Sequence, residues 1–154
     1  MESYKIRAAE LTDIETIQSF QLLLARESEG ILLDKEVLIN GLKAVFDDPS
    51  KGKYFLCTHQ GTAVASLMIT YEWSDWRNGM VWWIQSVYVE ASHRKSGVFS
   101  RMYEFIRQKA IQDPQVKGLR LYVDTTNFPA LEVYKKVGMN GDHYRVFEWM
   151  KDQD

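Results

Sequence analysis

The segment from Lys53 to Tyr71 constrains the fold most, because it predicts a β-hairpin in the middle of the chain. Residues typical of strands run over 53–60 and again over 62–71, and the glycine between the two runs, Gly61, supplies the turn. The second run alternates between side chains that point to opposite faces of a sheet. The sequence therefore predicts antiparallel strands at the centre of the fold.

Helical patterns lie on both sides of this hairpin. Ile14, Ile17 and Phe20 recur at helical spacing, and Thr12 with Glu15 matches a capping box that would begin this helix. We expect strands over 4–8, 53–60, 62–71, 80–90, 119–123 and 144–150, and helices over 12–27, 34–48, 98–113 and 129–137. The order β-α-α-β-β-β-α-β-α-β predicts an α/β domain with a mixed sheet.

Composition excludes several classes of protein. A chain of 154 residues that is 45% hydrophobic can bury a core, so we predict one domain over 1–154. The net charge of −2 gives no reason to expect a nucleic-acid or membrane partner, and three scattered histidines give no metal-ligand spacing. No apolar run is long enough for a signal peptide or a membrane span. We predict a soluble, cytoplasmic protein without a metal.

The connection after the strand 80–90 reads HRKSG and leads into a helix that begins near Val98. A helix N-terminus carries unpaired N–H groups and the positive end of the helix dipole, and a glycine lets the backbone turn closely around an anion. Arg94 and Lys95 add positive charge at the same place. An ordinary strand-to-helix connection would have the same composition, so this loop alone leaves both interpretations open.

Two motifs lie in the second half of the chain. The first is Arg94, two residues and Gly97, with Phe99 two positions later. The second is an asparagine, a short helix with a tyrosine, and a glycine ending, formed by Asn127, Ala130, Tyr134, Gly138 and Met139. Together they resemble the motifs of the GCN5-related N-acetyltransferase (GNAT) family. The first family motif is Gln or Arg, two residues, Gly, one residue, then Gly or Ala, so Phe99 stands here in place of the final small residue. The departure at Phe99 would either crowd the pyrophosphate of coenzyme A or turn the ring into the core.

The resemblance implies the GNAT fold and transfer of the acetyl group of acetyl-CoA to the primary amine of a small molecule. Backbone N–H groups of Val87 and Val89 would pair with the pantetheine and polarise the thioester carbonyl. By the same resemblance, the pyrophosphate would lie on Arg94, Lys95, Ser96, Gly97, Val98 and Phe99.

The second motif implies a general acid. Tyr134 would protonate the departing thiolate, although a core tyrosine on an amphipathic helix would give the same sequence pattern. Asn127 would contact the cofactor or the loop near it, and its alternative role is that of a plain helix cap.

No single carboxylate is identified as the general base. Glu72 is our candidate, Asp75 and Glu90 are alternatives, and each has a solvated carboxylate as its plain explanation. The stretch WWIQ at 82–85, where some family members supply a base, has no carboxylate, so a water relay or loss of the proton to solvent stays open.

Tryptophans around Asp75 suggest an acceptor pocket. Trp73 and Trp76 flank this carboxylate and could form with it an aromatic, anionic site for the cationic amine. A homodimer contact, or packing under the loop, is the alternative. Two further functions stay open for the whole chain. One is a GNAT-fold module that binds acyl-CoA without turnover, and the other is an interaction domain that uses its exposed tryptophans.

Overall fold

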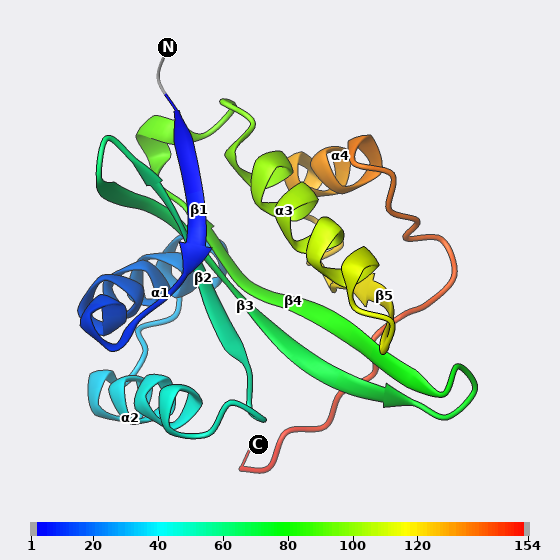
Figure 1. Cartoon of the computed structure of the whole chain (residues 1–154). Helices are drawn as coiled ribbons and strands as arrows, with labels where there is room; N and C mark the ends of the chain where they lie inside the picture. The colour runs from blue at the N-terminus through cyan, green and yellow to red at the C-terminus, as the bar shows by residue number, and fades with distance from the viewer. Residues whose placement is uncertain (1–2, 153–154) are drawn as a thin grey trace. The chain divides into compact units, whose positions relative to one another are not determined.

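The computed structural model describes residues 3–152, which fall into two compact units that divide after Leu121. The first unit contains a five-stranded mixed sheet in the spatial order β1-β2-β3-β4-β5 (Figure 1). Its strands are β1 (Tyr4–Ala8), β2 (Lys53–His59), β3 (Thr62–Ser74), β4 (Gly79–Val89) and β5 (Val116–Arg120). Only β4 and β5 run parallel to each other, whereas the other neighbours are antiparallel. The predicted α/β class and mixed sheet are confirmed.

Helices cover both faces of this sheet. α1 (Ile14–Glu29) and α2 (Lys35–Asp47) lie on one face, and α3 (Val98–Gln112) lies on the other (Figure 1). The second unit contains α4 (Phe128–Lys136). Asp34 begins α2 as predicted, because its carboxylate accepts hydrogen bonds from the N–H groups of Glu36 and Val37.

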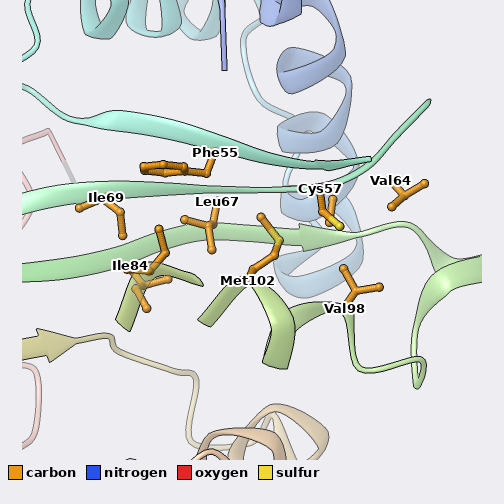
Figure 2. Packing of buried hydrophobic residues seen from close by; sticks show 10 residues of the cluster. Phe55, Cys57, Val64, Leu67, Ile69, Ile84, Val98 and Met102 are labelled. Carbon is orange, nitrogen blue, oxygen red and sulfur yellow. The ribbon is translucent and has the colours of Figure 1, made fainter. Parts of the chain in front are cut away.

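The core of the first unit has two parts, one on each face of the sheet. Toward α3, apolar side chains of β2, β3 and β4 pack against Met102 and Ile106, which are fully buried (Figure 2). Toward α1 and α2, Tyr54 and Leu56 pack with Ile17 and Leu42. Neighbouring residues of β2 thus enter different parts of the core, which explains why this strand is almost continuously apolar.

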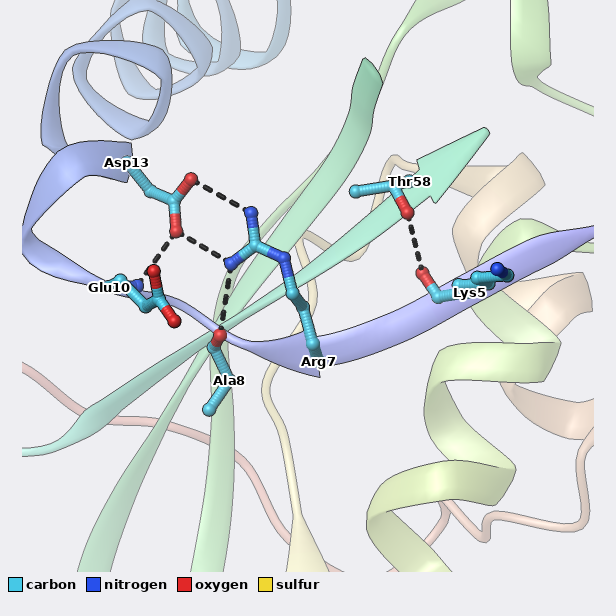
Figure 3. Close-up of polar contacts among 6 residues, drawn as sticks. All are labelled: Lys5, Arg7, Ala8, Glu10, Asp13 and Thr58. Carbon is cyan, nitrogen blue, oxygen red and sulfur yellow. Dashed lines mark hydrogen bonds and ion pairs between the residues drawn. The ribbon is translucent and has the colours of Figure 1, made fainter. Parts of the chain in front are cut away.

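The entry into α1 differs from the predicted capping box. A 3₁₀ turn over Leu11–Asp13 precedes the helix, and the Asp13 carboxylate accepts a hydrogen bond from the Glu10 N–H at 2.7 Å. Asp13 also accepts two hydrogen bonds from the Arg7 guanidinium, at 2.7 and 3.0 Å (Figure 3). The Arg7 hydrogen bonds are the main cause of a lowered pKa of Asp13. The bidentate ion pair ties the end of β1 to the helix.

Two predicted strands need correction. β5 covers Val116–Arg120 rather than 119–123, because these residues pair with Met80–Trp83 of β4 before the chain turns away. The predicted strand over 144–150 is wrong: no neighbouring strand pairs with it among residues 3–152, and its apolar side chains face solvent, with Phe147 94% exposed. Alternating side chains favour a strand, but an isolated strand has no partner for its backbone groups.

Candidate functional site

The second half of β4 has an open edge. β5 pairs with β4 only between Met80 and Trp83, and β5 ends at Arg120. Over residues 84–89, therefore, β4 pairs with β3 on one side, and no strand among the described residues pairs with it on the other. An open strand edge offers N–H and C=O groups to an extended ligand.

A β-bulge lies within this open half. Ser66 pairs with Tyr88 but Met68 pairs with Gln85, so two residues of β4 stand opposite Leu67 alone. One of the two, Ser86, has a left-handed φ of 55°, which is uncommon for a residue with a side chain. The bulge therefore changes the direction of the backbone groups next to Val87.

The N–H of Val89 points to the open edge. The following N–H, that of Glu90, donates to the Val64 oxygen of β3 at 2.9 Å. Because successive N–H groups of a strand point to opposite sides, the Val89 N–H points away from β3. The carbonyl oxygen of Val89 lies on the same open side and accepts a hydrogen bond from Arg94 Nε at 2.8 Å.

The loop after β4 forms a concave row of N–H groups. Lys95 and Gly97 both have a left-handed φ, 63° and 75°. The N–H groups of Lys95, Ser96, Gly97 and Val98 make no hydrogen bond of normal geometry within residues 3–152. A backbone of this kind, followed by the N-terminus of α3, makes an anion-binding concavity.

The Arg94 guanidinium is not the mobile charge that its position in the loop suggested. Its Nη2 atom lies 2.8 Å from Glu27 Oε1 of α1, in addition to the contact with the Val89 oxygen. Lys95 is exposed and keeps its side chain at the loop surface. The positive charge for an anion at this loop thus comes from Lys95 and from the helix terminus.

Phe99 turns toward the core. Its ring is half-buried, packs against the apolar cluster under α3, and lies 6.2 Å from the ring of Tyr103. The aromatic ring therefore does not fill the concavity, and the loop geometry is compatible with a pyrophosphate.

The second unit holds the residues of the second motif. Asn127 Oδ1 accepts a hydrogen bond from the Ala130 N–H at 3.2 Å, so this residue is the N-cap of α4. Tyr134 lies on α4, and burial raises the pKa of its hydroxyl. A raised pKa keeps the phenol protonated at neutral pH, as it is in an ordinary tyrosine, and makes the hydroxyl a weaker proton donor. Contact of Asn127 with a cofactor stays a prediction.

The carboxylate of Glu72 is held by neighbours. Its Oε1 atom accepts hydrogen bonds from Trp83 Nε1 at 2.8 Å and from Arg120 Nη1 at 2.9 Å. The Trp83 hydrogen bond is the main cause of the lowered pKa of Glu72, and Arg120 adds to the effect. A carboxylate of lowered pKa is a weaker base, so this geometry disfavours the role of general base. The two hydrogen bonds instead indicate a structural contact that joins β3, β4 and β5.

Because of this contact, we expect Glu72→Gln to lower the free energy of unfolding by an amount that depends on pH. A group whose pKa is lowered on folding stabilises the protein above its unfolded pKa, and this contribution disappears as the pH falls through the folded pKa. Because the pair is partly exposed, we expect a loss of about 0.5–1 kcal/mol at pH 7, which disappears as the pH falls below the usual glutamate pKa and through the lowered pKa of Glu72. Urea unfolding at several pH values measures this loss. Turnover should stay within about twofold, whereas loss of a true base would lower it about a hundredfold.

The three residues of the predicted acceptor pocket lie at the far end of β4. Trp73, Asp75 and Trp76 surround the β3–β4 turn, where Trp76 is 90% exposed. At about 3.3 Å per residue, β4 extends roughly 23 Å from Gly79 to Ser86. The turn and the bulge are therefore far apart within one chain. An acceptor pocket at this turn stays a prediction, which this separation disfavours.

Sequence reasoning missed two residues of α1 that contact the open half of β4. Gln21 is 7% exposed and donates from Nε2 to the Ser86 oxygen at 3.3 Å. Glu27 accepts from Tyr88 and Arg94. A signal existed for the first, because Gln21 follows Ile14 and Ile17 at the spacing of the buried face of α1. Glu27 carries no such signal.

Family membership is decided by a match over most of the chain. The model of the "Acetyltransferase (GNAT) family" matches residues 13–139. The chain belongs to the GNAT family.

Solved structures agree with this assignment. A possible acetyltransferase from Clostridium difficile 630 is 41% identical, with 96% of this chain and 97% of that chain covered and a TM-score of 0.88. Two distant structures show the fold alone. A predicted acetyltransferase with acetyl-CoA from Clostridium acetobutylicum is 18% identical (coverage 95% and 96%, TM-score 0.74). The aminoglycoside N-acetyltransferase AAC(6')-Iy in complex with CoA is 12% identical (coverage 98% and 97%, TM-score 0.79). No curated protein matches the sequence.

Neither a membrane-spanning helix nor a metal-binding cluster occurs among the described residues. Within 3–152, no helix is long and apolar enough to cross a membrane. No group of three or more His, Cys, Asp or Glu side chains in that range is arranged to hold a metal ion. The single cysteine, Cys57, is fully buried, and burial raises the pKa of its thiol. A nucleophilic role for this thiol is therefore disfavoured.

Proposed function

We propose that this GNAT protein is a cytoplasmic enzyme that transfers the acetyl group of acetyl-CoA directly to a primary amine of a small molecule. One observation carries the proposal. The open half of β4 leads, within a few residues, into four N–H groups of the next loop and helix start that make no hydrogen bond of normal geometry in residues 3–152. An extended ligand with a pyrophosphate at one end fits this order of an open strand edge followed by an anion site.

The backbone supplies both recognition elements. The N–H groups of Lys95 to Val98 would hold the pyrophosphate, and the open edge near Val87 and Val89 would pair with the amides of pantetheine. At the bulge, an N–H close to the thioester oxygen would stabilise the charge that develops there as the amine adds. No metal and no covalent enzyme intermediate is required.

Tyr134 would complete the reaction as general acid. The amine nitrogen forms a bond to the thioester carbon, the carbon–sulfur bond breaks, and the sulfur takes a proton from the tyrosine hydroxyl. Burial raises the pKa of Tyr134, so its hydroxyl is protonated at the start of each turnover and gives up its proton only to a strong base such as the departing thiolate. The phenolate then regains a proton from solvent.

The amine must lose a proton before it attacks, because primary amines are protonated near pH 7. The contacts of Glu72 favour a structural role over that of a base. We therefore propose that water carries the amine proton to bulk solvent. A profile of kcat/KM that rises with the pKa of the acceptor amine itself would support this proposal.

The names of two fold relatives support the choice of ligands. One relative is described with acetyl-CoA, and the other is an aminoglycoside N-acetyltransferase described with CoA. Their low identity supports a shared fold rather than a shared acceptor, so the acceptor here is proposed only as a small amine.

Titration calorimetry with acetyl-CoA, after a check that none co-purifies, tests the cofactor site. We expect binding of one molecule per chain, and release of free thiol when amines and amino acids are then screened as acceptors. Folded, cofactor-free protein that shows no heat of binding would contradict the proposal. Binding without thiol release from any amine would instead indicate a module that binds acyl-CoA without turnover.

A further inference from the structure

One carboxylate of α1 connects the two parts of the candidate cofactor site. Glu27 Oε2 accepts a hydrogen bond from the Tyr88 hydroxyl of β4 at 2.7 Å, and Glu27 Oε1 accepts one from Arg94 Nη2 at 2.8 Å. The same guanidinium donates from Nε to the Val89 oxygen at 2.8 Å and lies 5.4 Å from the centre of the Tyr88 ring. Arg94 is thereby held on three sides.

We propose that Glu27 is a positioning residue for acetyl-CoA, which acts through Arg94 to fix the anion-binding loop against the open edge of β4. The proposal rests on the proposed function, because it assigns the ligand of that same loop. Glu27 itself would not contact the cofactor.

Arg94 lies in the chain between the open edge of β4 and the row of loop N–H groups. Arg94 immediately precedes Lys95, the first residue of the concave row of N–H groups. Its side chain reaches back to Val89, whose N–H is part of the open strand edge. The guanidinium therefore bridges the two backbone surfaces that acetyl-CoA would contact together. Fixing this bridge before binding removes an ordering cost that a free loop would meet on binding.

Tyr88 makes Glu27 a fixed anchor rather than a mobile surface charge. The ring of Tyr88 is buried and lies 5.4 Å from the ring of Phe20, also on α1. Its hydroxyl has a pKa raised to about 12 by burial and by Glu27, so it stays a hydrogen-bond donor at all ordinary pH values. Hydrogen bonds from Tyr88 and Arg94 lower the pKa of Glu27, which stays ionised near neutrality.

Positioning and simple electrostatics predict opposite effects of removing this charge. If Glu27 acted only as a negative charge near an anionic ligand, its loss would strengthen binding. If it positions Arg94, its loss would weaken binding, because the glutamine amide cannot accept from both neighbours as the carboxylate does. The sign of the change therefore distinguishes the two roles.

Titration calorimetry with CoA on Glu27→Gln and on Glu29→Gln shows whether the Kd for CoA rises or falls. Glu29 is exposed on the same helix, so its substitution makes the same change of charge without touching Arg94 or Tyr88. We expect the Kd of Glu27→Gln to rise roughly fivefold, because the Glu27–Arg94 pair is partly exposed. We expect the kcat of Glu27→Gln at saturating acetyl-CoA to equal that of the wild type. We also expect the Kd of Glu29→Gln for CoA to stay unchanged. An unchanged or lower Kd in Glu27→Gln would overturn the proposal.

A double-mutant cycle tests whether Glu27 acts through Arg94. Arg94→Gln should weaken CoA binding, and adding Glu27→Gln to it should cause no further loss, because the contact is already broken. Independent losses that multiply in the double variant would overturn the proposal. If Glu27→Gln does not fold, Arg94→Lys tests the positioning role instead. Lysine keeps the charge but lacks the guanidinium fork, so unchanged CoA binding in this variant would count against positioning.

Failure of this inference is separable from failure of the proposed function. If wild-type protein does not bind CoA, the proposed function fails. If wild-type protein binds CoA and Glu27→Gln binds it equally well, the proposed function stands and only the positioning role is lost.

Discussion

Tyr134→Phe should lower kcat by about a hundredfold or more, while the KM for acetyl-CoA stays nearly constant. The substitution removes one oxygen from a half-buried ring on α4 and keeps the apolar packing. Without the hydroxyl, the sulfur would have to leave as a thiolate without a nearby proton donor. The loss would therefore fall on the chemical step and not on cofactor binding.

Release of free thiol at saturating acetyl-CoA measures this effect. Tyr122→Phe serves as the matched control, because it removes the same oxygen from an exposed tyrosine of the same unit. The loss in Tyr134→Phe should be largest at high pH, where solvent supplies fewer protons to the leaving sulfur. Equal turnover in wild type and Tyr134→Phe, with melting temperatures that agree, would assign the ring to packing alone.

Much of the fold could be predicted from local patterns. The β2–β3 hairpin, the start of α2 at Asp34 and the start of α3 at Val98 depend on interactions between residues close in sequence, such as turns and caps. The segment 144–150 shows where this reasoning stops. Its alternation resembles that of a strand, but a strand exists only where another strand pairs with it, and the pairing partner is not encoded locally.

The candidate site also combines features set by neighbouring residues with features set by residues far apart in the sequence. The backbone features of the loop were predictable, because a glycine between a strand and a helix permits the left-handed turn that brings the unpaired N–H groups of the helix start around an anion. The side-chain roles were not. Arg94 reads as a free positive charge in the sequence, but Glu27 lies 67 positions away and binds it. Glu72 likewise reads as a solvated carboxylate until Arg120, 48 positions away, pairs with it.

Gly97→Ala should weaken acetyl-CoA binding by about tenfold or more, which makes it the second large effect expected for this protein. Gly97 has a φ of 75°, where a Cβ atom costs about 1–2 kcal/mol. A Cβ atom at this position would meet no other atom within 4 Å, so the protein itself has room for it. The added methyl group would instead occupy the open space from which a pyrophosphate reaches the loop N–H groups.

Gly61→Ala separates backbone strain from loss of the anion site. Gly61 has a φ of 79° and equally open surroundings, but it lies at the turn between β2 and β3. Both variants should lose about 1–2 kcal/mol of unfolding free energy, because they place the same methyl group on the same kind of backbone. Only Gly97→Ala should also lose affinity for acetyl-CoA in calorimetry. If both variants bind equally well, the pyrophosphate does not approach the loop at Gly97, and the anion site assigned to residues 95–98 is wrong.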